Sequence, residues 1–169
     1  MKKPVRILTA ATLFLAVASA TAQDIRRTPL ANSHFPISVA VTVPASADTV
    51  YFSGVLPEVA NVAAPKGSIE AYGDTQAQTL SVLRRLQAAL AAEGLAFGDV
   101  VQLRVFLVGD PKLDGKLDFA GLNAAYGQFF GTSAQPAKPA RTAVQVVALP
   151  LPGALVEIDL VAAKAVRAH

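Results

Sequence analysis

The sequence of 169 residues contains no cysteine, no tryptophan and only two histidines. Without cysteine the chain can form no disulfide and no thiolate metal site. The histidines, His34 and His169, stand alone near the two ends, and no group of histidines and carboxylates has the spacing of metal ligands. We therefore predict no metal site, and we assign neither histidine a catalytic role.

The first 22 residues contain an apolar run that is too short for a membrane-spanning helix. A basic head precedes this run, residues 7–20, whereas a spanning helix needs about 20 apolar residues. Small residues follow, and peptidase cleavage fits best after Ala22, with Ala20 as the alternative. We predict that residues 1–22 are a cleavable signal peptide and that the protein is periplasmic or secreted. The other interpretation is an uncleaved membrane anchor.

Net charge is also lacking once this signal is removed. The chain has 15 Lys and Arg against 12 Asp and Glu, and three of the bases, Lys2, Lys3 and Arg6, lie in the predicted signal. Cleavage therefore leaves 12 residues of each sign and no net attraction to a polyanion. We expect no nucleic-acid partner, and no membrane contact after cleavage.

The remaining chain has the size of one domain with one core. Residues 23–35 are polar, contain a proline and show no periodicity, so we predict a flexible lead-in. A single domain is expected over residues 36–165, followed by a short tail, 166–169. No internal repeat and no low-complexity segment interrupts the domain.

Hydrophobic periodicity divides the domain into strands and helices. Leucines at helical spacing predict a helix that begins after an N-cap at Asp74 and stops at Gly94. Alternation or turn residues predict the other elements: a strand–turn–strand unit at 37–43 and 49–54, a strand at 97–110, a helix at about 117–130, and a hairpin of strands at about 141–149 and 155–164.

The order β-β-α-β-α-β-β predicts an α+β fold, a mixed sheet with both helices on one face. Strand 97–110 is apolar on both of its faces, which is typical of a strand that is covered on both sides. Two helices cannot cover both faces of the sheet. An oligomer is the simplest way to bury the second face.

Pro-Ala-Arg at 139–141 and Val-Glu-Ile at 156–158 resemble the C-terminal signature of the RidA family of enamine and imine deaminases, also called YjgF/YER057c/UK114. The strand "YFSG" at 51–54 and the helix "LNAAYGQFF" at 122–130 match two further motifs in the same order. The resemblance covers about residues 36–165.

The resemblance implies a chorismate-mutase-like α+β fold and a homotrimer with three sites in clefts between its subunits. It also implies hydrolysis of 2-imino or enamine acids to ketoacids and ammonia, without a metal or an organic cofactor. The expected partners are therefore a small substrate that carries a carboxylate and further copies of the same chain.

Within the matched motifs, Arg141 and Glu157 are the predicted catalytic residues. A guanidinium holds a carboxylate by two parallel hydrogen bonds, so Arg141 would bind and orient the substrate. The apolar neighbours of Glu157 favour the protonated form of a carboxyl group, which suits a residue that takes up and releases protons. The structural alternative is an ion pair of Arg141 with Glu157 or Asp159, and Asp159 itself is expected to be structural.

Five further residues are predicted to line the cleft or to bind substrate: Ser53, Gly54, Ile37, Ala143 and Asn123. Glycine at 54 would let the substrate approach the backbone, or would simply form a turn. Asn123 would cap its helix or shape the cleft. Ile37 and Ala143 replace a tyrosine and a cysteine of the family, and Val55 replaces a glutamine, so the cleft should be more apolar.

Three alternatives to a deaminase differ in what the site would do. A non-catalytic trimer would use Arg141 to bind small carboxylates without turning them over. A ribonuclease is disfavoured by the balanced charge and by the lack of a basic and aromatic stripe. A chaperone-like holdase would use the apolar surface, but no other feature of the sequence indicates one.

Overall fold

A computed structural model of the protein describes residues 24–165, so the predicted signal peptide and the tail lie outside the described residues. Its centre is a four-stranded sheet in the order β3-β6-β4-β5. The strands are β3 (Ala47–Val55), β4 (Val100–Val108), β5 (Ala140–Val146) and β6 (Val156–Ala165). Strand β6 runs antiparallel to β3 and β4, whereas β4 and β5 are parallel.

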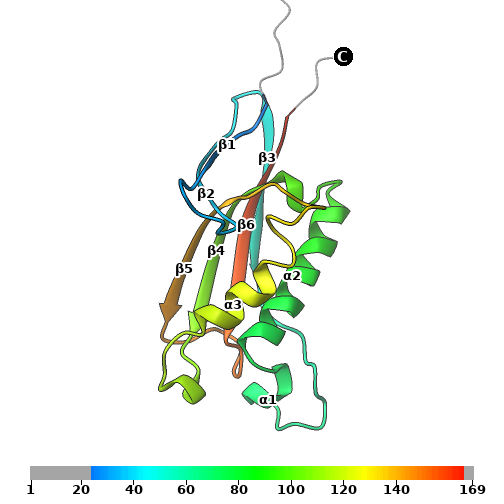
Figure 1. The fold of residues 1–169 in the computed structure, drawn as a ribbon. Helices are drawn as coiled ribbons and strands as arrows, with labels where there is room; N and C mark the ends of the chain where they lie inside the picture. Colours follow the sequence, from blue (N-terminus) through cyan, green and yellow to red (C-terminus); the bar gives the residue numbers. More distant parts are fainter. Residues whose placement is uncertain (1–23, 166–169) are drawn as a thin grey trace, which may run out of the picture.

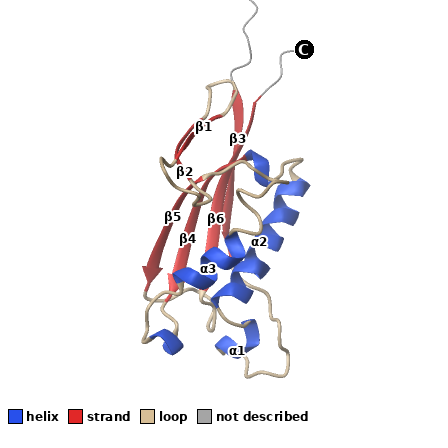
Figure 2. Ribbon diagram, in the orientation of Figure 1, coloured by secondary structure: helices blue, strands red, loops and turns tan. Residues whose placement is uncertain are grey.

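Both longer helices cover one face of this sheet, as Figures 1 and 2 show. They are α2 (Thr75–Ala92) and α3 (Phe119–Tyr126), which pack against each other. A single turn, α1 (Ile69–Tyr72), and two 3-10 turns (Phe97–Asp99 and Pro111–Leu113) complete the helical part. The predicted α+β class with helices on one face is confirmed.

The ends of α2 follow the predicted caps. The carboxylate of Asp74 accepts a hydrogen bond of 2.9 Å from the backbone N–H of Ala77, which satisfies a donor that the first helical turn would leave free. Beyond the last turn, Gly94 has a φ of +66°, a conformation that glycine adopts without strain. Helix α3 is shorter than predicted and ends at Tyr126.

The core lies between α2, α3 and the sheet. It consists of aliphatic and aromatic side chains that are almost completely buried, chiefly Val82, Leu83, Leu86, Leu90, Leu103, Leu107, Leu122, Tyr126, Phe130, Leu155, Ile158 and Leu160. The leucines of α2 that defined its helical spacing are in this set, with the exception of Leu80. The same spacing therefore predicted both the helix and most of its buried face.

The predicted C-terminal hairpin is wrong, although both of its strands exist. Strand β4 lies between β5 and β6, so that residues 141–149 and 155–164 do not pair with each other. Arg141 pairs with Leu103 on one side of β4, and Leu160 pairs with Leu103 on the other. The connection of residues 147–155 is long enough to cross the end of β4, which a two-residue hairpin turn could not do.

The predicted flexible lead-in contains a strand. Strand β1 (Arg26–Pro29) pairs with β2 (Ser38–Thr42) in a separate two-stranded sheet. The guanidinium of Arg27 donates hydrogen bonds of 2.7 and 3.1 Å to the carbonyls of Gly98 and Val100, which attaches this sheet to the start of β4. Consequently β2 and β3 belong to different sheets and do not form the predicted strand–turn–strand unit.

The sheet face opposite the helices carries exposed apolar side chains. Tyr51 on β3 is 79% exposed and Val144 on β5 is 41% exposed. We call this side the open face. Within residues 24–165, no helix is long and apolar enough to cross a membrane.

Candidate functional site

Arg141 lies on the helix-covered face of the sheet, near the start of β5. Its cross-strand partner Leu103 is completely buried against the helices, and paired residues of neighbouring strands point to the same face. The Arg141 side chain therefore extends toward α3. Because β5 is the last strand of the sheet, Arg141 also lies close to the sheet edge.

The guanidinium of Arg141 is surrounded by three aromatic rings. Its central carbon lies 4.4 Å from the ring centroid of Tyr126, 5.1 Å from that of Phe35 and 5.6 Å from that of Phe119. All three distances fall within the range of a cation–π interaction. These contacts hold the planar cation without neutralising its charge.

Asn123 fixes the orientation of the same guanidinium. Its side-chain Oδ1 accepts a hydrogen bond of 2.9 Å from Nη2 of Arg141, and its Nδ2 donates to the carbonyl of Phe119 at 2.8 Å. Helix α3 begins at the N-cap Asp118, whose carboxylate accepts from the N–H of Gly121. The cap therefore sets the start of the helix that presents Phe119, Asn123 and Tyr126 to Arg141.

Arg141 has no acidic partner in the part of the chain that the structure describes. Its Nη1 is buried and makes no hydrogen bond. Asp159, one predicted partner, pairs instead with Arg104 at 2.8 Å. Burial lowers the pKa of Arg141, and the nearby Tyr126 opposes this effect. A buried cationic donor without a hydrogen-bond partner raises the free energy of the folded protein. This environment therefore favours binding of an anion.

Glu157 lies on the open face, against a bulge in β3. Its partner on β4 is Phe106, and its neighbours Val156 and Ile158 point into the core. The pairing of β3 with β6 shifts between Phe52 and Val55, which leaves Ser53 and Gly54 opposite a single residue of β6. A Cβ at Gly54 would collide with the Glu157 carboxylate. Glycine therefore makes room for this carboxylate.

One subunit does not bring Arg141 and Glu157 together. Two strand-to-strand spacings, across β4, and three residues along β6 separate them in the register of the sheet, which corresponds to about 14 Å between their Cα atoms. Their side chains also point to opposite faces. A single subunit therefore does not place both residues at one cleft, and the predicted site in a cleft between subunits stays a prediction.

The other predicted residues divide between these two places. Ala143 follows Arg141 on the same face of β5, and both Ala143 and Ile37 pack against the core. Ser53 is exposed at the bulge beside Gly54. The aromatic rings around Arg141 were not predicted as site residues. Phe119 and Tyr126 lie in the helix predicted at about 117–130, Tyr126 within the matched motif, and Phe35 ends the segment predicted to be a flexible lead-in.

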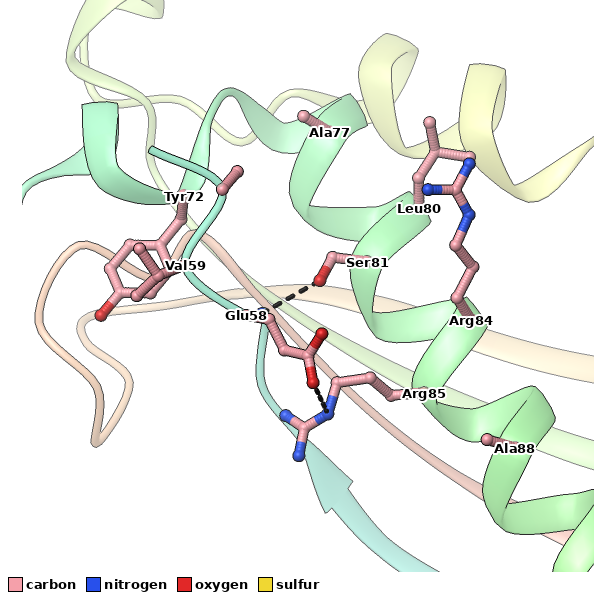
Figure 3. A pocket seen from close by; sticks show the side chains of 10 residues that line it. Glu58, Val59, Tyr72, Ala77, Leu80, Ser81, Arg84, Arg85 and Ala88 are labelled. Carbon is pink, nitrogen blue, oxygen red and sulfur yellow. Dashed lines mark hydrogen bonds and ion pairs between the residues drawn. The ribbon is translucent and has the colours of Figure 1, made fainter. Parts of the chain in front are cut away.

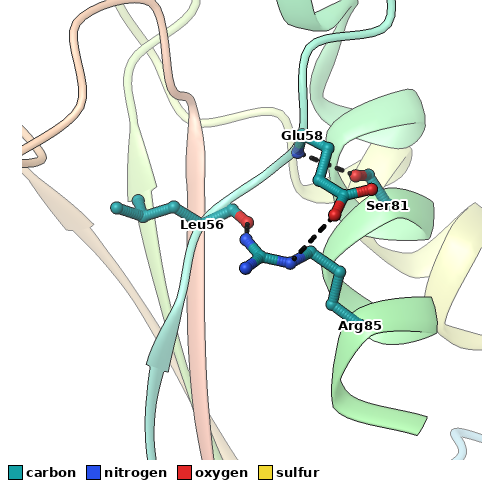
Figure 4. A network of polar contacts seen from close by, with 4 residues as sticks. All are labelled: Leu56, Glu58, Ser81 and Arg85. Carbon is teal, nitrogen blue, oxygen red and sulfur yellow. Dashed lines mark hydrogen bonds and ion pairs between the residues drawn. The ribbon is translucent and has the colours of Figure 1, made fainter. Parts of the chain in front are cut away.

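A polar network attaches the end of β3 to α2. Arg85 donates to the carbonyl of Leu56 at 2.6 Å and contacts the carboxylate of Glu58 at 3.4 Å. The hydroxyl of Ser81 accepts from the N–H of Glu58 at 3.0 Å (Figure 4). These contacts follow directly after the bulge, so they help to fix the segment that carries Gly54.

The same contacts form one side of a groove of about 570 Å³ on the outer side of α2. Arg85 and Glu58 point toward each other there, and Val59 and Tyr72 line the opposite part (Figure 3). Neither Arg141 nor Glu157 lines this groove. Among residues 24–165, no three His, Asp or Glu side chains are grouped as they would be to hold a metal ion.

Comparison with known proteins finds relatives over most of the chain. Residues 28–164 match the family model described as Endoribonuclease L-PSP. Protein DfrA of Myxococcus xanthus is 40% identical over 127 residues, which cover 75% of this chain and 84% of that protein. TdcF of Escherichia coli, named as a reactive intermediate deaminase, is 36% identical over 101 residues, 60% of this chain and 68% of its own.

Solved structures with the same fold include YyfB of Yersinia pestis, from the conserved Rid protein family. Its structure covers 84% of this chain and 100% of its own, with a TM-score of 0.62 and 26% identity. A structure of Escherichia coli TdcF with bound serine covers 79% of this chain and 96% of its own, with a TM-score of 0.52 and 27% identity.

Proposed function

The chain belongs to the Endoribonuclease L-PSP family, also called the RidA or YjgF family, and we propose that it deaminates reactive 2-imino and enamine acids. The products are the corresponding ketoacids and ammonia. In this proposal Arg141 holds the substrate carboxylate and Glu157 moves protons. The relative named as a reactive intermediate deaminase supports the general reaction.

The observation that carries the proposal is the half-buried guanidinium of Arg141, whose buried Nη1 makes no hydrogen bond and which has no acidic partner among the described residues. A carboxylate supplies the charge and the acceptors that Nη1 lacks, through hydrogen bonds that are stronger than those between neutral groups. Asn123 and the three rings already fix the guanidinium, so binding costs little further ordering. The serine bound to TdcF, which carries a carboxylate, supports this class of ligand.

The reaction needs one water and two proton transfers. The water oxygen forms a bond to the imine carbon, and the electron pair of the C=N bond moves to the nitrogen. Glu157 accepts one proton from this water and delivers it to the nitrogen, which gives a carbinolamine. The second proton then passes from the new hydroxyl through Glu157 to the amine nitrogen. Ammonia leaves as the C–N bond breaks, and the former water oxygen becomes the carbonyl of the ketoacid.

We propose that each site combines Arg141 of one subunit with Glu157 of a neighbouring subunit in a homotrimer. The two side chains lie on opposite faces of their own sheet, about 14 Å apart by strand spacing, so one small acid cannot contact both within a subunit. The exposed Tyr51 and Val144 on the open face support association through that face.

We further propose that the protein acts outside the cytoplasm. Residues 1–22 have the basic head, apolar run and small residues of a signal peptide. The mass of the chain recovered from the periplasm or the medium tests this, since cleavage after Ala22 would remove residues 1–22.

The decisive experiment measures ketoacid and ammonia release while an amino-acid oxidase generates imino acids in place. The mature protein should accelerate release. Arg141→Ala and Arg141→Lys should lose about a hundred-fold or more in kcat/KM, because an ammonium cannot form the two parallel hydrogen bonds. Arg84→Ala is the matched control, since Arg84 is an exposed arginine of α2. An unchanged rate with every imino acid would contradict the proposal.

A second candidate is a non-catalytic module that binds small carboxylates. It is favoured by one observation: the aromatic and amide contacts of Arg141 are complete within the subunit, whereas Glu157 is remote from them. Calorimetric binding of a ketoacid that is lost in Arg141→Ala but retained in Glu157→Gln, without turnover by the wild type, would establish this function instead.

A further inference from the structure

We propose that Phe35 and Phe119 form a selective wall at the Arg141 site that favours acids with large apolar side chains, aromatic ones above all. The inference rests on the proposed function for its turnover assay. It goes beyond that function because it names the side chain of the substrate and the two residues that recognise it.

The Phe119 side chain is not part of the hydrophobic core. It is the first residue of α3, and its side chain is 44% exposed although the rings of Tyr126 and Phe130 are completely buried. Its ring stacks on that of Phe35, with centroids 6.2 Å apart and an angle of 25° between the planes. Two aromatic rings thus meet at the surface beside a buried cation.

The wall lies where the side chain of a bound acid would extend. A carboxylate carbon held by a guanidinium lies about 4 Å from the central guanidinium carbon, and the rings of Phe35 and Phe119 lie 5.1 and 5.6 Å from the same atom. Atoms one or two bonds beyond the carboxylate are therefore within reach of these rings.

Phe35 belongs to a connection outside the main sheet. It lies between β1 and β2, and its backbone N–H donates to the hydroxyl of Ser33 in the same connection at 3.1 Å. Its ring can therefore adjust to a substrate ring without breaking a pairing of the main sheet.

A substrate ring that packs against Phe35 and Phe119 extends their aromatic stack beside the cation. The methyl group of an alanine-derived acid cannot make that contact. Since an aromatic pair contributes more than its buried area alone, the site should prefer the larger acid. Ile37, which packs in the same connection against the core, adds further apolar surface.

The test compares kcat/KM for imines generated from phenylalanine and from alanine. The wild type should prefer the phenylalanine-derived imine by roughly ten-fold. Phe119→Ala and Phe35→Ala should each reduce this ratio by at least about three-fold.

Val62→Ala, a truncation at a side chain that is 93% exposed in a loop, should leave the ratio unchanged. A ratio near one in the wild type, or one insensitive to both phenylalanine substitutions, would overturn the inference while leaving the deaminase intact.

A binding measurement keeps the inference testable if no imine is turned over. Phenylpyruvate should bind more tightly than pyruvate by a similar factor, and Phe119→Ala should narrow the difference. Loss of binding of both ketoacids in Arg141→Ala would show that they bind at this site. Equal affinity for the two ketoacids would count against the selective wall, whatever the assay of turnover gives.

Discussion

The absence of a side chain at Gly54 leaves space for the side chain of Glu157. The Glu157 carboxylate occupies the space that a Cβ at Gly54 would fill. Gly54 does not have a positive φ, so the requirement for glycine there comes from this close approach and not from the backbone conformation. The bulge at Ser53 and Gly54 is therefore part of the support of Glu157.

Replacing Gly54 by alanine should displace the Glu157 carboxylate. We expect kcat to fall by about ten-fold or more with a smaller change in KM, because in the proposed mechanism Glu157 acts on the reacting atoms while Arg141 binds the carboxylate. Gly98→Ala is the control, since a Cβ at Gly98 meets nothing within 4 Å. Steady-state kinetics and circular dichroism of both variants check the prediction. An unchanged kcat in a folded Gly54→Ala variant would contradict a dependence of catalysis on this position of the Glu157 carboxylate.

The sequence indicated candidate site residues, but not the side chains that surround them. Arg141 and Glu157 could be selected because charged residues in apolar strands are unusual and because they match a family signature. The stack of Phe35 on Phe119 could not be predicted, since it joins residues 84 positions apart. Alternation and helical spacing indicate which face of its own strand or helix a side chain occupies. They do not indicate which side chains of other elements it contacts.

At the scale of whole elements, Gln78 connects the start of α2 to the connection between β5 and β6. This side chain is completely buried. Its Nε2 donates to the carbonyls of Gly73 and Gly153 at 2.8 and 3.1 Å, and its Oε1 accepts from the N–H of Leu155 at 2.7 Å. One amide thus forms hydrogen bonds with three backbone groups, one just before α2 and two in the connection that leads into β6.

Gln78→Leu should destabilise the fold by about 3 kcal/mol, because three backbone groups lose their partner in a buried place. Gln87→Leu on the exposed side of the same helix should change stability by less than about 0.5 kcal/mol. The free energy of unfolding in urea, measured at one protein concentration, checks both values. Equal stability of the two variants would show that the network around Gln78 contributes little.

The elements themselves were largely predictable, and their pairing was not. Alternation predicted β3 and β4, and leucine spacing with Asp74 and Gly94 predicted α2. The hairpin prediction failed because neighbouring strands in sequence often pair, whereas here β4 separates β5 from β6. Strand β1 was missed because its four residues are mostly exposed and show no apolar alternation. Strand order depends on contacts between distant segments, which local patterns do not contain.

At the scale of the whole molecule, the sheet holds the two proposed catalytic residues apart. Arg141 extends toward α3 on the helix side, and Glu157 lies on the open face beside Gly54. No change of rotamer brings side chains from opposite faces of one sheet onto the same small acid. A shared site therefore requires the edge of one subunit at β5 to meet the open face of another.

Mixed oligomers test this arrangement directly. Arg141→Ala and Glu157→Gln should each be inactive alone. When the two variants are unfolded together in equal amounts and refolded, each site draws Arg141 and Glu157 from different chains. About a quarter of the sites then receive both intact residues, so about a quarter of the wild-type activity should return.

If both residues acted within one subunit, no mixed site would be complete and the mixture would stay inactive. Wild-type protein taken through the same refolding corrects for losses, so the recovered fraction distinguishes the two arrangements.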